Sequence, residues 1–145
     1  MSREEARRAA ITSLTISIAG THAGDTGCVS DLIEIRDAIR QFIAERDWQQ
    51  YQHPKSVMLA LVGEVGELAE LLQWLPAENT RELIAEEPLK TRLGEEVADV
   101  LIYLLGLADQ CDIDVREATF RKINDSRSKH PVEAVKGVAP PPSLG

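Results

Sequence analysis

The sequence is poor in aromatic residues and cysteines, and it has no long hydrophobic run. Phe, Trp and Tyr make up 4% of its 145 residues. The two cysteines, Cys28 and Cys111, lie far apart and form no C-x-x-C pair. This argues against a disulfide scaffold or a zinc knuckle and favours a reducing, cytoplasmic setting. The longest apolar stretch, residues 100–108, is far shorter than the roughly 18 residues of a membrane span, so we expect no membrane partner.

Positive charge is also scarce. Lys and Arg total 16 against 24 Asp and Glu, which gives a formal net charge of −8. This balance argues against a basic groove that binds a nucleic acid polymer. Hydrophobic residues make up 43%, enough for a globular domain, and they are mainly Leu, Ile, Val and Ala, which favours helices. A chain of this length corresponds to one domain with a modest core, which helical proteins often complete by forming homo-oligomers.

The two ends of the chain differ in composition from its middle. We expect residues 1–29 to be a flexible extension, because several glycines with Thr and Asp between them form a linker before residue 30. An apolar stretch near the start faintly resembles a targeting segment, but Glu4 and Glu5 do not fit its basic beginning. Residues 131–145 are rich in proline and are expected to be a flexible tail.

The middle of the chain, residues 30–130, is predicted to be one all-α domain. Apolar residues recur there at helical spacing, and prolines and capping residues mark the ends of the repeats. The predicted helices cover 30–46, 55–74, 89–111 and 114–128, with a short one at 81–86. We therefore expect a four-helix-bundle-like subunit that assembles into a dimer or a dimer of dimers.

Four carboxylates lie on helix faces that are otherwise apolar. Glu64 and Glu67 lie beside a stripe of Leu and Val, and Glu96 and Asp99 lie in a helix whose residues 97–108 carry no other charge. An i, i+3 spacing points both side chains of a pair the same way, so two antiparallel helices could bring all four to one site. A carboxylate left unpaired in apolar surroundings is costly or takes up a proton. We therefore expect a cation to face them.

The type of ligand restricts the type of metal. Oxygen-only ligands favour Mg²⁺ or Mn²⁺ over zinc, and neither helix contains the His that a di-iron bundle requires. Acidic pairs at this spacing are also common on solvated helix faces, so one pair alone is weak support for a metal site. There are two such pairs on adjacent helices, and both are flanked by apolar residues. A metal site is then about as good an explanation as a solvated surface.

Four of the six aromatic residues are candidates for a nucleotide pocket, namely Trp48, Tyr51, Trp74 and Tyr103. Trp74 shares a helix face with Glu67, and Tyr103 follows Asp99 by one turn. Aromatic rings stack on nucleobases, although any one of them alone is more often a helix-packing residue. Lys122 in the last helix could neutralise a phosphate or favour the negative end of the helix dipole. Together with a metal, this set favours a nucleotide ligand.

Four segments of the sequence carry a resemblance to a known family. They are AERDWQQY at 44–51, LALVGEVGELAELLQW at 59–74, EEVADVLIYLLGLA at 95–108 and KINDSRSKHP at 122–131. By these segments, the chain from about residue 31 to 137 resembles the MazG-like all-α nucleoside triphosphate pyrophosphatases, and among these the dCTP pyrophosphatase branch. The ExxE and ExxD motifs are moderately specific, and the long block ending in QW is more so.

The resemblance implies a nucleotide-pool housecleaning enzyme. It implies hydrolysis of a nucleoside triphosphate, dCTP or a modified dCTP, between the α- and β-phosphates to give the monophosphate and pyrophosphate. It also implies Mg²⁺ on the four carboxylates, which would lower the pKa of an attacking water, a base pocket formed by the four aromatic residues, and a phosphate contact from Lys122. Members of the family are dimers or dimer-derived tetramers.

Two positions depart from the dCTP-type pattern. Ile39 stands where relatives that prefer dCTP carry a His, and Ser126 stands where the family often has an Asn, so base and sugar preference stay open. Two other functions also stay open. One is a non-catalytic helical module whose acidic faces bind a basic partner, and the other is the related phosphoribosyl-ATP pyrophosphohydrolase chemistry.

Overall fold

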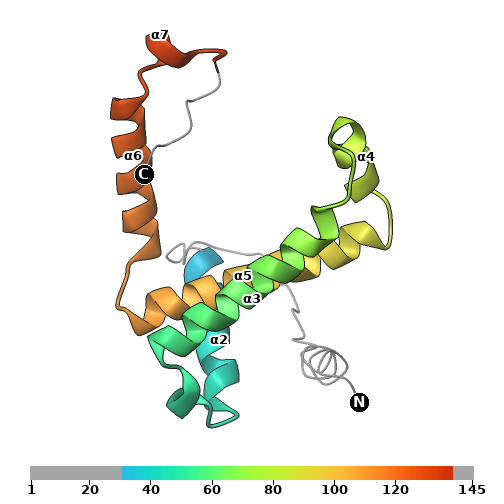
Figure 1. Ribbon diagram of the computed structural model, residues 1–145. Helices are drawn as coiled ribbons and strands as arrows, with labels where there is room; N and C mark the ends of the chain where they lie inside the picture. The colour runs from blue at the N-terminus through green and yellow to red at the C-terminus, as the bar shows by residue number, and fades with distance from the viewer. Residues whose placement is uncertain (1–30, 139–145) are drawn as a thin grey trace, which may run out of the picture.

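The computed structural model describes residues 31–138, and every regular element in this part of the chain is helical. Figure 1 labels the α-helices, and we write η for a 3-10 helix. The order is α2 (Asp31–Ala44), η1 (Gln49–Tyr51), α3 (Pro54–Leu72), η2 (Ala77–Asn79), α4 (Thr80–Ile84), α5 (Leu89–Gln110), α6 (Val115–Lys129) and α7 (Val132–Val135). The predicted all-α class is confirmed. The predicted extension over residues 1–29, which includes Cys28, lies outside the described residues.

The two longest helices, α3 and α5, form an antiparallel pair at the centre of the fold (Figure 1). Val57 and Leu61 of α3 and Leu105 and Ala108 of α5 are buried. Their spacing of three or four residues places each pair on one face of its helix. At Gly106 an added Cβ would lie 4.0 Å from Val57 Cγ1, so Val57 packs directly over this glycine and sets the register of the two helices.

The ends of the helices follow from capping residues. Pro54 begins α3, where a proline is tolerated because the missing N–H would have had no helical partner. His53 precedes it, and His53 Nδ1 accepts a hydrogen bond of 3.3 Å from the N–H of Lys55. Asp114 caps α6 by accepting a hydrogen bond of 2.8 Å from the N–H of Glu117. The predicted helix bounds agree with the structure to within two residues.

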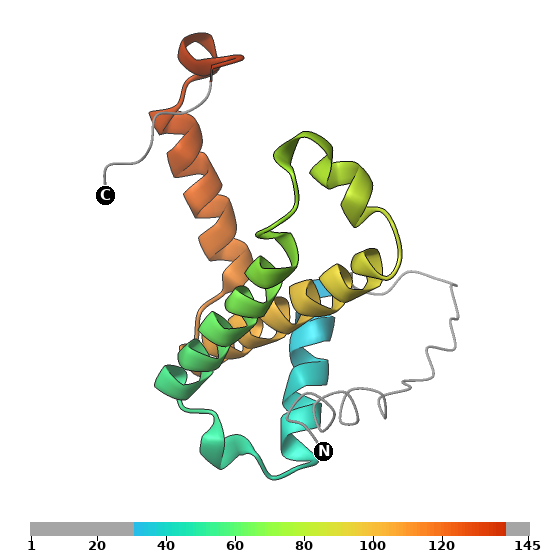
Figure 2. The same ribbon diagram turned by 45° about the vertical axis from the view of Figure 1, so that its right-hand side comes forward.

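Helix α2 packs across α5 near the end of α5 that leads into α6 (Figures 1 and 2). The chain turns sharply after α2, where Asp47 has a φ of 52°. The rings of Phe42 and Trp48 then meet edge to face with centroids 5.9 Å apart, and the guanidinium of Arg46 lies 3.7 Å above the Phe42 ring. These contacts hold Trp48 against the end of α2.

Helix α6 projects away from the α3–α5 pair (Figures 1 and 2). Within residues 31–138, α3, α2 and α4 all pack on α5, whereas α6 makes no contact of similar extent with another helix. The four long helices therefore do not close into a bundle within one chain. This differs from the four-helix-bundle-like subunit that the sequence predicts. The reason is that α6 is mostly polar, and its apolar residues Phe120 and Ile123 are 54% and 41% exposed. The short helix α7, which begins the proline-rich segment, was not predicted.

Little apolar surface is buried within one chain. The apolar stripe of α3, defined as Met58, Val62, Val65 and Leu72, is 36–56% exposed. Since these residues recur every three to seven positions, they form one continuous face of the helix beside the face that packs on α5. None of the described helices is both long and apolar enough to cross a membrane.

Candidate functional site

Three of the four predicted carboxylates come together between α3 and α5. One carboxylate oxygen from each of Glu64, Glu96 and Asp99 lies within 4.8 Å of the other two. Glu64 is only 2% exposed, and Glu96 and Asp99 are half-buried. We refer to these three residues as the carboxylate cluster. A charged residue as buried as Glu64 is rare unless it is paired or binds a metal.

The register of the two helices explains why the cluster forms. Val57 of α3 packs over Gly106 of α5. Glu64 lies seven residues after Val57, and Asp99 lies seven residues before Gly106. Seven residues are almost two helical turns, or about 10 Å of rise. In an antiparallel pair, Glu64 and Asp99 therefore face each other about two turns along from the contact between Val57 and Gly106. The glycine and the two acids therefore belong to one packing pattern.

Glu67, the fourth predicted ligand, is exposed and does not belong to the group of three. It lies about 60° around α3 from Glu64, since three residues at 100° each fall short of a full turn. Glu64 takes the position that faces α5, and Glu67 is turned away from α5 toward solvent. The i, i+3 argument thus predicted the neighbourhood of Glu67 but not its membership of the cluster.

The donor set fits a hard divalent cation. All three groups offer oxygen, which Mg²⁺ and Mn²⁺ prefer, and the cluster holds no Cys or His that would favour zinc. One oxygen of Glu64 and one of Glu96 are buried from solvent, so a cation there would be held partly inside the protein. Mg²⁺ is typically held by one or two carboxylates together with water and substrate phosphates, and the cluster supplies three carboxylates.

A single face of α5 leads from the cluster to a cavity. Residues Glu96, Asp99, Tyr103, Gly106 and Gln110 follow each other at intervals of three or four and share this face. The cavity at its far end has a volume of about 360 Å³. Its wall combines apolar groups, two arginines, one aspartate and three carboxamides, and includes Ile39, Ile43, Gln49, Gln52, Gly106 and Gln110. We refer to it as the amide-lined cavity.

The three glutamines were missed by sequence reasoning. Gln110 could have been found, because it continues the helical spacing of Asp99 and Tyr103 along α5. Gln49 and Gln52 lie in and beside η1, whose position over α5 depends on the turn after α2. No periodicity in the sequence reports that position. The departure noted at Ile39 is placed in the wall of this same cavity.

The predicted aromatic residues do not gather around the cluster. Trp48 and Tyr51 lie beside the start of α3 and are 42% and 64% exposed, whereas Trp74 follows its end and is 86% exposed. The 19 residues of α3 separate them, a length of about 28 Å. Tyr103 is half-buried on the face of α5 that carries the cluster. One chain therefore presents two separate aromatic sites.

Lys122 and Ser126 lie on α6. That helix runs away from the α3–α5 pair (Figure 2), so neither residue is carried toward the cluster by its own helix.

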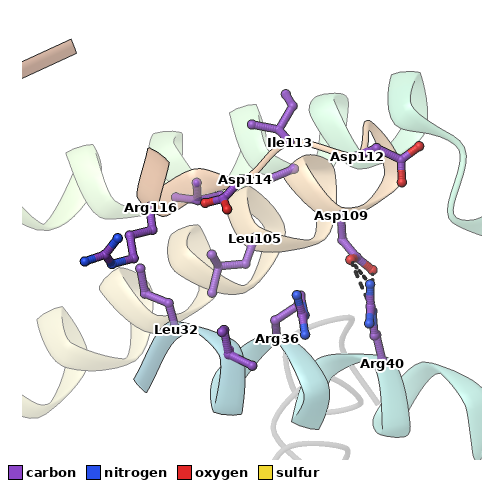
Figure 3. A pocket seen from close by; sticks show the side chains of 12 residues that line it. Leu32, Arg36, Arg40, Leu105, Asp109, Asp112, Ile113, Asp114 and Arg116 are labelled. Carbon is purple, nitrogen blue, oxygen red and sulfur yellow. Dashed lines mark hydrogen bonds and ion pairs between the residues drawn. The ribbon is translucent and has the colours of Figure 1, made fainter. Parts of the chain in front are cut away.

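A second cavity, of about 320 Å³, lies where α2, the end of α5 and the start of α6 meet (Figure 3). Three arginines and three aspartates surround an apolar floor that includes Leu32 and Leu105. Arg40 and Asp109 point toward each other at one edge of this space and form an ion pair (Figure 3). The hydrogen bond to Asp109, and then its negative charge, raise the pKa of the Arg40 guanidinium.

Comparison with known proteins matches residues 52–132 to the MazG nucleotide pyrophosphohydrolase domain. The chain is 44% identical over 108 residues to dCTP pyrophosphatase 1 of Bos taurus and 41% identical over 105 residues to that of Homo sapiens, covering 74% and 72% of this chain. The matches span 64% and 62% of those proteins, slightly less than two thirds of their length. A crystal structure of a pyrophosphatase from Archaeoglobus fulgidus superposes with a TM-score of 0.65 at 34% identity, over 77% of this chain and 99% of that one.

Proposed function

The chain belongs to the MazG nucleotide pyrophosphohydrolase family, whose domain matches more than half of it, and we propose that it hydrolyses a nucleoside triphosphate to the monophosphate and pyrophosphate. The proposed substrate is dCTP or a modified dCTP, by similarity to relatives named for dCTP. In this reaction water adds to the α-phosphorus, and the bond from that phosphorus to the oxygen bridging to the β-phosphate breaks. The proposed role is to remove surplus or non-canonical nucleotides.

The observation that carries this proposal is the carboxylate cluster. Glu64, Glu96 and Asp99 would hold a Mg²⁺ ion, or Mn²⁺ in its place, and Glu67 would join them from the exposed side of α3. When bound, such an ion neutralises phosphate charge and makes a water molecule more acidic. The protein's own contribution is to fix the three carboxylates on two rigid helices, so that the triphosphate is oriented by its charge before hydrolysis.

The amide-lined cavity suits the nucleoside part of the substrate. It begins about 10 Å along α5 from Asp99, the rise of seven helical residues, on the same face of the helix. Its carboxamides can both donate and accept hydrogen bonds, as the edge of a neutral base requires. Tyr103 lies between the cluster and this cavity on the shared face, where its ring can pack beside the sugar or base.

A second copy of the chain would complete the site and cover the apolar stripe of α3. An exposed apolar helix face is typical of a protein interface. If the copies place their α3 helices antiparallel, Trp74 of one copy comes next to Trp48 and Tyr51 of the other, and the two aromatic sites become one. We therefore propose a homodimer or a dimer-derived tetramer, in which α6 and its Lys122 reach toward phosphates bound by another copy.

The test is to incubate the protein with a panel of nucleoside triphosphates and Mg²⁺ and to measure both pyrophosphate and orthophosphate. We expect pyrophosphate and the matching monophosphate, with loss of activity in EDTA and in Glu96→Gln. Glu70→Gln, an exposed acid on α3, is the matched control. Release of orthophosphate, or undiminished turnover by Glu96→Gln, would contradict the proposal. Phosphoribosyl-ATP belongs in the panel, because it tests the related chemistry directly.

The same variants test the non-catalytic alternative. If the acidic faces only bind a basic protein, Glu64→Gln and Asp99→Asn will leave the affinity for Mg²⁺ and for nucleotide unchanged. We expect both affinities to fall, measured by isothermal titration calorimetry.

A further inference from the structure

One ion pair joins two helices that are far apart in the sequence. Arg40 of α2 donates from Nε to both carboxylate oxygens of Asp109 on α5, at 3.1 and 2.9 Å, and from Nη2 to Oδ1 at 2.5 Å. By contrast, the pairs Arg36–Asp37 and Arg121–Glu117 each lie within one helix. Arg40 and Asp109 therefore tie α2 to α5, and we refer to them as the α2–α5 clamp.

The clamp has the geometry that fixes an orientation. The planar guanidinium meets the carboxylate with two of its nitrogens, which restricts both distance and angle more than a single contact does. Asp109 is only 16% exposed, although Arg40 is 55% exposed. Solvent screens an ion pair less when its acceptor is partly buried than when both partners are exposed. The pair can therefore hold α2 in place.

The clamp also forms the partition between the two cavities. Arg36, Arg40, Leu105 and Asp109 line both the amide-lined cavity and the cavity shown in Figure 3. On one side lies a space of about 320 Å³ with an aspartate-rich rim. On the other lies the space of about 360 Å³ that contains Ile39, the neighbour of Arg40 in the chain. A movement of α2 would change the width of both spaces at once.

We infer that Arg40 and Asp109 are positioning residues that set base selectivity by holding α2 against α5 and closing one end of the nucleoside subsite. This inference rests on the proposed function, since it assigns the amide-lined cavity to the nucleoside. With the clamp closed, Ile39 and the three glutamines enclose a single-ring base. With the clamp removed, the subsite opens toward the second cavity and accepts a two-ring base more readily.

The test compares dCTP with dATP, both with Mg²⁺. In Arg40→Ala we expect the preference for dCTP over dATP, taken as the ratio of the two kcat/KM values, to fall by about threefold or more. The loss should appear mainly as a change in KM rather than in kcat, because Arg40 lines the proposed nucleoside cavity and is not part of the carboxylate cluster. Asp109→Ala should behave in the same way.

A charge-exchange experiment tests whether the ion pair itself, rather than either side chain alone, sets the selectivity. Arg40→Asp alone should lose selectivity, and Arg40→Asp combined with Asp109→Arg should recover most of it. Gln41→Ala is the matched control, because Gln41 is the next residue on α2 and its side chain donates to Glu45, just past the end of the same helix, at 2.8 Å. It should keep the wild-type selectivity.

A second measurement does not depend on catalysis. Hydrogen exchange of the amides in α2 should become faster in Arg40→Ala and not in Gln41→Ala. Unchanged exchange in Arg40→Ala, or unchanged selectivity in an active Arg40→Ala enzyme, would overturn the inference and leave the proposed function intact. A wild-type protein that releases no pyrophosphate from any nucleotide would instead contradict the proposed function.

Discussion

Replacing Glu64 with Gln should stabilise the protein without metal and destabilise its complex with metal. The three carboxylates of the cluster lie within 4.8 Å of one another. At that distance two ionised carboxylates repel by about 3.5 kcal/mol with an effective dielectric constant of about 20. The Gln side chain keeps the shape of Glu64 and removes two of the three pairwise repulsions, which together amount to about 7 kcal/mol before any offsetting contact is counted.

The measured gain will be smaller, because counter-ions and neighbouring donors already offset much of the repulsion. We expect the free energy of unfolding of Glu64→Gln in EDTA to exceed that of the wild type by about 1–3 kcal/mol. In Mg²⁺ at ten times its dissociation constant, the wild type should gain about 1.4 kcal/mol. The variant should gain less, since it has lost the most buried ligand.

The assay is urea denaturation followed by circular dichroism, in EDTA and in excess Mg²⁺, at one fixed protein concentration because assembly contributes to stability. Glu70→Gln removes one exposed charge from the same helix and should change neither curve by more than about 0.5 kcal/mol. The reasoning is refuted if Glu64→Gln is less stable than the wild type in EDTA, or if Mg²⁺ stabilises both proteins equally.

Three further predictions concern the fold. Leu61→Ala empties a buried position between α3 and α5 and should lower the free energy of unfolding by about 2–5 kcal/mol in urea; a loss below 1 kcal/mol would argue against this core. Asp114→Ala removes the cap of α6 and should cost about 1 kcal/mol, visible as faster hydrogen exchange in the first turn of α6 while α3 is unchanged. Val62→Glu places a charge in the apolar stripe of α3 and should shift the molar mass in light scattering toward the monomer, whereas Glu70→Gln should not; an unchanged mass would show that the stripe is not the interface.

The helices and the position of the cluster could be predicted because both depend on local periodicity. Glu64 and Asp99 each lie at a position where the helical repeat points inward, and two successive helices of this length can pair antiparallel. The direction of α6 could not be predicted, because it depends on the backbone of the short link between α5 and α6. In that link Asp112 has a φ of 53°, a conformation that the sequence does not specify.

Glu67 and Gln49 show two different limits of reasoning from a sequence. Glu67 was grouped with Glu64 because a spacing of three residues places two side chains near each other, but a rotation of about 60° is enough to put one in the interface and the other outside it. Gln49 carries no periodic signal, and it reaches the amide-lined cavity only because the turn after α2 folds η1 back toward α5. Side chains placed by irregular backbone are those that a helical wheel cannot locate.

The division of the candidate site follows from the length of α3. A helix of 19 residues keeps Glu64 near its middle and sends its two flanking aromatic segments to opposite ends. A single chain therefore brings the carboxylate cluster together but keeps Trp48 apart from Trp74. The same helix carries the exposed apolar stripe, and an antiparallel second copy that covers this stripe brings the start of one α3 to the end of the other. On the proposed assembly, the contact that completes the core is therefore also the contact that joins Trp48 to Trp74. On this proposal the metal site and the amide-lined cavity form within one chain, whereas the aromatic part of the site needs two copies.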